Sequence, residues 1–146
     1  MDPEFFAKAR KMLVSEEGLR HSPYYDQVNK LTIGIGHNLS DVPLSDAAVN
    51  LIFQEDLEAA LTFAMRLFTP EEFHSWTLSR QLAVINMIFN LGNQGFSRFI
   101  QTIIAIKDEN WLGASLHALD SDWARQVPER AVRVTKMLHD ETFPYA

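Results

Sequence analysis

Two carboxylic acids near the N-terminus, Glu17 and Asp26, are the residues whose type and spacing suggest catalysis. Enzymes that cleave glycosidic bonds typically use one carboxyl group as a proton donor and a second, ionised one on the other side of the bond. Thr32 and His37 follow within the same polar stretch. Two acids at this spacing are also compatible with an ordinary charged surface. Their interpretation therefore depends on the elements that position them.

The first acid is expected at the end of a helix. Apolar residues recur at helical intervals from Pro3 to Glu17, and Gly18 is the residue type that commonly follows a last helical turn. Carbonyl groups at that end carry partial negative charge, which suits a proton donor. Helical phase does not separate Glu17 from its neighbour Glu16.

The second acid is expected in a turn that leads into a hairpin. Asp26 begins a polar run of Asp, Gln, Asn and Lys, in which water and backbone amides can keep a carboxylate ionised. The residues from Leu31 to Gly36 then alternate as a strand does. The two glycines of this strand allow another backbone or a ligand to come close.

The rest of the chain is predicted to be helical. Ser45 is a good N-cap for a helix over residues 46–68, which would span roughly 35 Å. Thr69 and Pro70 begin another helix with a capping box. We expect Ser79 to cap a third helix, apolar on nearly every side and ended by Gly92 and Gly95. Further helices are expected over residues 96–106, over residues 111–119 and from Pro128 onward.

Composition narrows the class of protein. The chain has 146 residues, 47% of them hydrophobic and none of them cysteine, which suits one domain with a real core in a reducing compartment. The net charge of −6 argues against a nucleic-acid partner. No apolar run is long enough for stable membrane insertion. The first five residues lack the basic start of a signal peptide and read as a cloning remnant.

Three segments together resemble the phage-type lysozymes of glycoside hydrolase family 24. The first consists of EEGLR, then YYD, then TIGIGH, and the resemblance implies that Glu17, Asp26 and Thr32 are catalytic. The spacing of nine residues to Asp26 selects Glu17 over Glu16. Asn29 stands where the family often has glycine, and it tolerates the left-handed backbone that the turn requires.

The other two segments, VINMIFNLG and SDWARQVPERAVRV, extend the resemblance over most of the chain. It implies an α+β, mostly helical, lysozyme-like fold with the active cleft between two lobes. Residues 12–60 would form the small N-terminal lobe with its hairpin and the connecting helix, and residues 1–11 and 61–146 the larger helical lobe. The region between His37 and Ser45 is shorter than in the T-even phage enzyme of this family, so we expect the small lobe to be trimmed there.

The resemblance also implies roles outside the catalytic set. These are Arg130 paired with Glu17, His37 paired with Asp56, and contacts to substrate by Phe89, Thr102 and His117. In an apolar helix, however, a phenylalanine such as Phe89 is more often plain core. The three tryptophans could stack on sugars, but large aromatic side chains usually fill cores. A basic patch at Arg125, Arg130, Arg133 and Lys136 would offset the net negative charge against an anionic cell wall.

The expected function is that of an endolysin which hydrolyses the β-1,4 bond between N-acetylmuramic acid and N-acetylglucosamine in peptidoglycan, with inversion. It needs no cofactor and no metal, since the five histidines lack metal-binding spacing. We expect a monomer, made in the host cytoplasm, that acts on the cell wall after holin-dependent release. The alternatives are a lytic transglycosylase, an antibacterial effector muramidase and a non-catalytic helical module that binds the cell wall.

Overall fold

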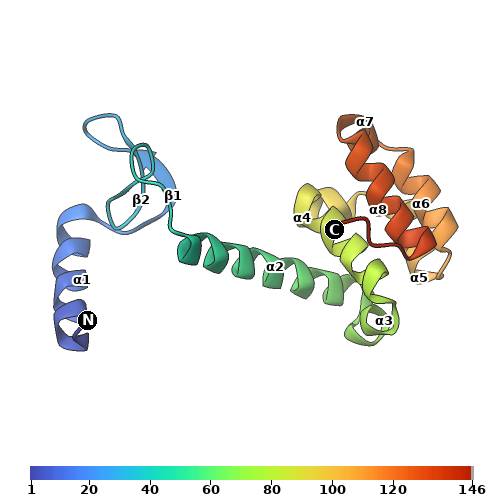
Figure 1. Ribbon diagram of the computed structural model, residues 1–146, viewed down its shortest axis with the longest axis horizontal. Helices are drawn as coiled ribbons and strands as arrows, with labels where there is room; N and C mark the ends of the chain where they lie inside the picture. The colour runs from blue at the N-terminus through green and yellow to red at the C-terminus, as the bar shows by residue number, and fades with distance from the viewer. Residues whose placement is uncertain (146) are drawn as a thin grey trace. The chain divides into compact units, whose positions relative to one another are not determined.

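The computed structural model describes residues 1–145 and divides the chain into two compact units, Met1–Asn50 and Leu51–Ala146 (Figure 1). The described residues form eight helices and three short strands. Helix α2 (Asp46–Phe68) begins in the first unit and continues in the second, and the Ser45 hydroxyl accepts a hydrogen bond from the Ala48 amide at 3.2 Å. The predicted bounds and cap of this helix are confirmed, as is the mixed, mostly helical class of the fold.

Helix α1 (Pro3–Glu17) opens the first unit as the sequence predicts. The Asp2 side chain accepts a hydrogen bond from the Phe5 amide at 3.0 Å, and proline occupies the first turn. The helix ends at Gly18, which has φ 80° and donates its amide to the Val14 carbonyl at 2.9 Å. Glu17 is therefore the last residue of α1.

A three-stranded antiparallel sheet in the order β1-β2-β3 follows: β1 (Arg20–Tyr25), β2 (Leu31–Gly34) and β3 (His37–Asn38). The prediction of one strand from Leu31 to Gly36 is wrong. Gly34 and Gly36 have φ 67° and 69°, so the chain reverses there and β3 pairs back onto β2. Two glycines in an alternating pattern marked a tight turn, since left-handed backbone costs glycine least.

The second unit is helical: α3 (Pro70–Ser75), α4 (Leu78–Ser97), α5 (Ile100–Lys107), α6 (Trp111–Leu119), α7 (Asp122–Gln126) and α8 (Pro128–Asp140). The Thr69 hydroxyl caps α3 by accepting the Glu72 amide at 3.2 Å. The prediction that Ser79 caps α4 is wrong. Helix α4 begins at Leu78 with Thr77 at the N-cap position, so Ser79 lies inside the helix. Its hydroxyl donates instead to backbone carbonyls near the end of α8 and beyond it.

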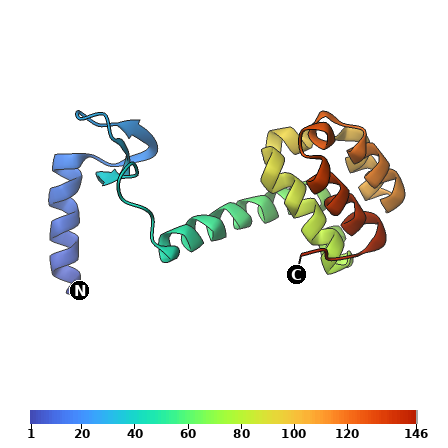
Figure 2. The ribbon, with the colours of Figure 1, turned by 45° about the horizontal axis from the view of Figure 1, so that its top comes forward.

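The core of the second unit lies around α4 and α8, and α8 also packs against α6 and α7 (Figure 2). Gly92, with φ 73° and ψ 167°, interrupts α4 near its end. Trp76 and Trp123 are buried, and the Trp123 Nε1 donates to Asn90 Oδ1 at 2.8 Å. Trp111 packs edge-on against Trp76. The core interpretation of Trp76 and Trp123 is thus confirmed.

Within residues 1–145, no helix combines the length and the apolar composition needed to cross a lipid bilayer.

Candidate active site

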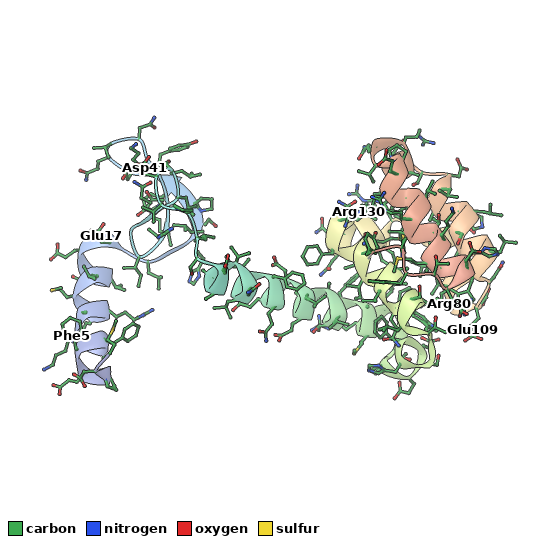
Figure 3. All side chains as sticks on the ribbon, in the orientation of Figure 1. Phe5, Glu17, Asp41, Arg80, Glu109 and Arg130 are labelled. Carbon is green, nitrogen blue, oxygen red and sulfur yellow. The ribbon has the colours of Figure 1, made fainter. Side chains whose placement is uncertain are left out.

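Glu17 lies against the turn between β2 and β3. A β-carbon built on Gly36 would stand 3.0 Å from Glu17 Oε2 and 3.2 Å from its carboxyl carbon. Glu17 is exposed at the end of α1 (Figure 3). Its carboxyl group lies against the backbone of Gly36, the second glycine of the turn. The expectation that the glycines allow a close approach is met at Gly36, and the group that approaches is Glu17 itself.

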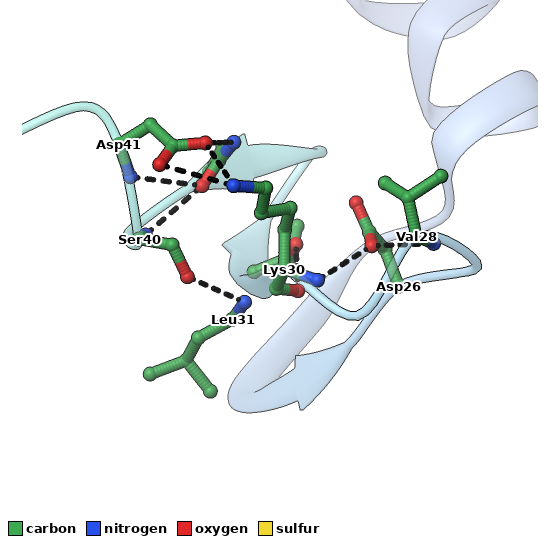
Figure 4. Close-up of polar contacts among 8 residues, drawn as sticks. Asp26, Val28, Lys30, Leu31, Ser40 and Asp41 are labelled. Atoms are coloured by element: carbon green, nitrogen blue, oxygen red, sulfur yellow. Dashed lines mark hydrogen bonds and ion pairs between the residues drawn. The ribbon is translucent and has the colours of Figure 1, made fainter.

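Asp26 is held by the turn that it begins (Figure 4). Its Oδ1 accepts hydrogen bonds from the Val28 amide at 2.9 Å and from the Lys30 amide at 2.8 Å. Its own amide donates to the Lys30 carbonyl at 3.0 Å. Asn29 supplies the left-handed residue of the turn with φ 61°, as expected of asparagine at this position. Both amides bind Oδ1, which leaves Oδ2 available for another donor.

Thr32 is buried, with 3% of its surface exposed, at the centre of the sheet opposite Tyr24 and Asn38. Its hydroxyl donates to the Lys30 carbonyl at 2.9 Å. The side chains of Asp26 and Thr32 therefore both bind Lys30: the Asp26 carboxylate binds its amide, and the Thr32 hydroxyl binds its carbonyl. The threonine oxygen keeps lone pairs with which it can accept a hydrogen bond.

Glu17 and Asp26 line the same hollow of the first unit, with a volume of about 540 Å³. Its other lining residues come from the end of α1, from β1 and from the turn after it: Glu16, Arg20, Tyr24, Tyr25, Gln27 and Val28. The Arg20 guanidinium stands over the Tyr24 ring at 4.5 Å. Two carboxyl groups beside aromatic and polar side chains form a surface suited to acid–base chemistry on a polyhydroxylated ligand.

An ion pair closes the other end of the hairpin. Lys30 Nζ lies 3.2 Å from Asp41 Oδ1 and 2.9 Å from Asp41 Oδ2, while the Asn38 side-chain amide donates to Oδ2 at 3.0 Å (Figure 4). These hydrogen bonds, first that from Lys30 and then that from Asn38, hold the pKa of the Asp41 carboxyl below its ordinary value. The Ser40 hydroxyl accepts the Leu31 amide at 2.9 Å, which ties the same loop to β2.

His37 lies in β3, and within the first unit its buried Nε2 atom has no hydrogen-bond partner. A buried polar atom without a partner is costly, so Nε2 is a site at which a partner would be stabilising. Asp56 belongs to the second unit, where it lines a hollow of about 300 Å³ with Phe89 and five other residues of α2 and α4.

Thr102 and His117 come together in the second unit. Both line a hollow of about 470 Å³ formed by α5, the end of α6 and the residues beside them. Thr102 is almost fully buried, with 2% of its surface exposed, whereas His117 is exposed. The structure therefore supports a shared hollow for this pair, with His117 as its accessible member.

Phe89 is not a core residue, because 44% of its surface is exposed. It lines the hollow that holds Asp56 and a second hollow of about 300 Å³ that holds Arg130. The Arg130 guanidinium is oriented by Asn86 of α4, whose Oδ1 accepts from Nε at 2.8 Å. Asn86 and Asn90 are the two polar side chains in the apolar run VINMIFNLG, and this contrast was the signal for the role of Asn86.

Two of the four residues of the expected basic patch, Arg125 and Arg133, pair with acids of their own helices. Arg125 Nη2 lies 2.7 Å from Asp122 Oδ1, and Arg133 Nη1 lies 3.9 Å from Glu129 Oε2. Lys136 is exposed. Among residues 1–145 no group of three or more histidine or acidic side chains is placed to hold a metal ion.

The family described as "Phage lysozyme" matches residues 14–133 of this chain. This range includes the first motif in full, the whole of α2 to α7 and the first part of α8.

Three relatives are similar over most of the chain. The pre-baseplate central spike protein Gp5 of Enterobacteria phage T4 is 30% identical over 88% of this chain, which covers 27% of that longer protein. Two proteins of Dictyostelium discoideum, named probable T4-type lysozymes 2 and 1, are 22% and 25% identical, each over 91% of this chain and 94% of their own length.

Proposed function

This chain belongs to the phage lysozyme family, which makes it a glycoside hydrolase of the lysozyme class, and we propose that it hydrolyses the β-1,4 bond between N-acetylmuramic acid and N-acetylglucosamine in peptidoglycan. The observation that carries this proposal is the hollow lined by both Glu17 and Asp26. Glu17 lies exposed at a helix end beside Gly36, whereas Asp26 is bound by two backbone amides, and two carboxyl groups with different tasks require such different surroundings.

Glu17 is the proton donor of the proposed reaction. Its proton goes to the glycosidic oxygen as the bond from that oxygen to the anomeric carbon breaks. Water attacks the anomeric carbon from the opposite face, and its proton passes to Asp26. The Asp26 Oδ2 atom and the Thr32 oxygen position this water, because Oδ1 is already occupied by the Val28 and Lys30 amides. The products are two shorter glycans, one with an inverted anomeric centre.

The other family positions have supporting roles in this proposal. Phe89, Thr102 and His117 contact the glycan, each from the lining of a hollow in the second unit. The roles that the family resemblance implies for Arg130 toward Glu17, and for His37 as the structural partner of Asp56, remain part of this proposal. The buried Nε2 atom of His37, which has no hydrogen-bond partner among the described residues, supports the need for such a partner.

The anomeric form of the first product tests the mechanism. With a soluble glycan, proton NMR during the first turnovers should show the α-anomer, and the two carboxyl groups in a substrate complex should lie about 6.5–9.5 Å apart. An initial β-anomer would contradict the use of water activated by Asp26. An anhydromuramic end would indicate a lytic transglycosylase.

Loss of turbidity of chloroform-treated cells tests the activity itself. A parent protein that binds cell walls without clearing them would be a wall-binding module and would contradict the proposal. Glu17→Gln serves as the matched inactive control, because it keeps the size and hydrogen bonding of the side chain but has no proton to donate at neutral pH.

We further propose that the chain acts as a monomeric endolysin, made in the host cytoplasm and released to the cell wall with the help of a holin. The similarity to a spike protein of phage T4 favours a second role, as the lysozyme part of a phage particle. Immunodetection in purified particles and in the lysate of producing cells separates the two roles. An adjacent immunity gene would instead indicate an antibacterial effector.

A further inference from the structure

The turn that binds the Asp26 side chain ends at Lys30, whose own side chain is held by an ion pair. The Lys30 amide donates a hydrogen bond to Asp26 Oδ1. The Lys30 carbonyl accepts hydrogen bonds from the Asp26 amide and from the Thr32 hydroxyl. The position of the Lys30 peptide group therefore sets the position of both residues proposed to handle the attacking water. Whatever restrains Lys30 restrains them.

Asp41 supplies that restraint. The Lys30 ammonium contacts both oxygens of its carboxylate, at 3.2 and 2.9 Å. Asp41 is fixed in turn by Asn38, which donates to its Oδ2 at 3.0 Å and accepts its backbone amide at 3.1 Å (Figure 4). Asn38 belongs to β3 and pairs with Thr32 across the sheet. These contacts connect Asp26 to Thr32 by way of Lys30, Asp41 and Asn38.

We propose that Lys30 and Asp41 are positioning residues for Asp26 and Thr32 in the hydrolytic reaction. The inference rests on the proposed function, in which Asp26 and Thr32 orient the water. Neither Lys30 nor Asp41 is among the lining residues of the hollow that holds the two carboxyl groups, so they act through the turn and not on the substrate.

The expected effect is on turnover and not on global stability. The Lys30 and Asp41 side chains are 42% and 52% exposed, and ion pairs at such exposure contribute little to folding. Small displacements of a catalytic group are by contrast costly, since a shift of about 1 Å can lower the rate by about 10²-fold. A loosened turn should therefore lower kcat while leaving KM unchanged and the melting temperature only slightly below that of the parent.

The experiment compares Lys30→Met, Asp41→Asn and the double variant on a soluble peptidoglycan fragment. We expect each to lower kcat by at least about threefold, with the double variant no worse than the worse single one because both break the same contact. Lys30→Arg keeps the cation and should restore most of the rate. The control is Lys8→Met, which breaks an ion pair of 2.8 Å between Lys8 and Glu4 on α1, away from the hairpin, and should leave kcat unchanged.

Amide exchange provides a readout that does not depend on activity. In the free protein, hydrogen exchange of the Lys30 and Val28 amides measured by NMR should be faster in Asp41→Asn than in the parent, and unchanged in Lys8→Met. A parent without muramidase activity would contradict the proposed function only, and the exchange rates would then decide this inference.

The inference is overturned if Asp41→Asn leaves kcat and both exchange rates unchanged. It is also overturned if the loss of rate follows a loss of thermal stability and Lys30→Arg does not restore it, because that result indicates a merely structural pair.

Discussion

The carboxyl group of Glu17 lies on the backbone of Gly36, so close that a β-carbon there would stand 3.0 Å from Oε2. Glycine at this position does two things at once. It permits the left-handed backbone of the turn, with φ 69°, and it leaves room for the proposed proton donor. The two effects are separable, because Gly34 has nearly the same φ of 67° and no atom within 4 Å of its own β-carbon position.

Gly36→Ala is expected to lower activity, whereas Gly34→Ala is not. Both variants should lose about 1–2 kcal/mol of unfolding free energy, because alanine is strained at positive φ. Only Gly36→Ala also displaces the Glu17 carboxyl group. Urea unfolding measures the shared loss, and the initial rate of wall lysis at a temperature where both variants are folded measures the difference. Equal activity of the two variants would show that the contact with Glu17 has no functional weight.

Glu17→Gln should reduce lysis by about 10²–10⁴-fold with folding intact, because the amide cannot protonate the leaving oxygen. Glu16→Gln is the matched control, since Glu16 is adjacent, lines the same hollow and lacks the contact with Gly36. Its rate should remain close to that of the parent. If Glu16→Gln abolishes lysis and Glu17→Gln does not, the assignment is displaced by one residue.

Asp26→Asn should abolish most of the activity while preserving the turn. The Asn side-chain oxygen can still accept the Val28 and Lys30 amides that now bind Oδ1, but an amide cannot accept a proton from water. We expect a loss of at least about 10²-fold in kcat and little change in the amide chemical shifts of the turn. An Asp26→Asn protein with parental kcat would remove Asp26 from the mechanism.

Thr32→Val should separate the role of the hydroxyl from that of the buried side chain. Valine has a similar shape, but it leaves the Lys30 carbonyl without the donor that now lies at 2.9 Å. Activity should fall, and Thr32→Ser should retain more of it because serine keeps the hydroxyl. The comparison of kcat between these two variants, with circular dichroism to confirm folding, checks the prediction.

The lowered pKa of Asp41 predicts that the folded protein becomes slightly less stable as the pH falls into the acid range. Its pKa is lowered in the folded protein by the hydrogen bonds from Lys30 and Asn38, so its contribution is fully present above the unfolded pKa of about 4 and is lost as pH falls through the folded pKa. Asp41→Asn should therefore melt at a slightly lower temperature than the parent at pH 6, with the difference disappearing toward pH 2. A difference in melting temperature that grows on acidification would contradict this sign.

The local sequence pattern was sufficient to predict those features of the structure that depend on residues close together in the chain. The ends of α1 and α2, the caps at Ser45 and Thr69 and the left-handed Asn29 all depend on a few neighbouring residues, and all were predicted. The family was also evident from short motifs. The first of these motifs lies within residues 15–39 and contains all three proposed catalytic residues.

Tertiary structure decided what depends on groups distant in sequence. The local sequence predicted Ser79 as an N-cap, but its hydroxyl donates to the backbone carbonyls of Met137 and Thr142, near the C-terminus. The contact of Glu17 with Gly36, the pairing of Lys30 with Asp41 and the orientation of Arg130 by Asn86 likewise join segments that no periodicity links. A residue type reveals which hydrogen bonds it can make, but only the folded chain determines which partner arrives at the right distance.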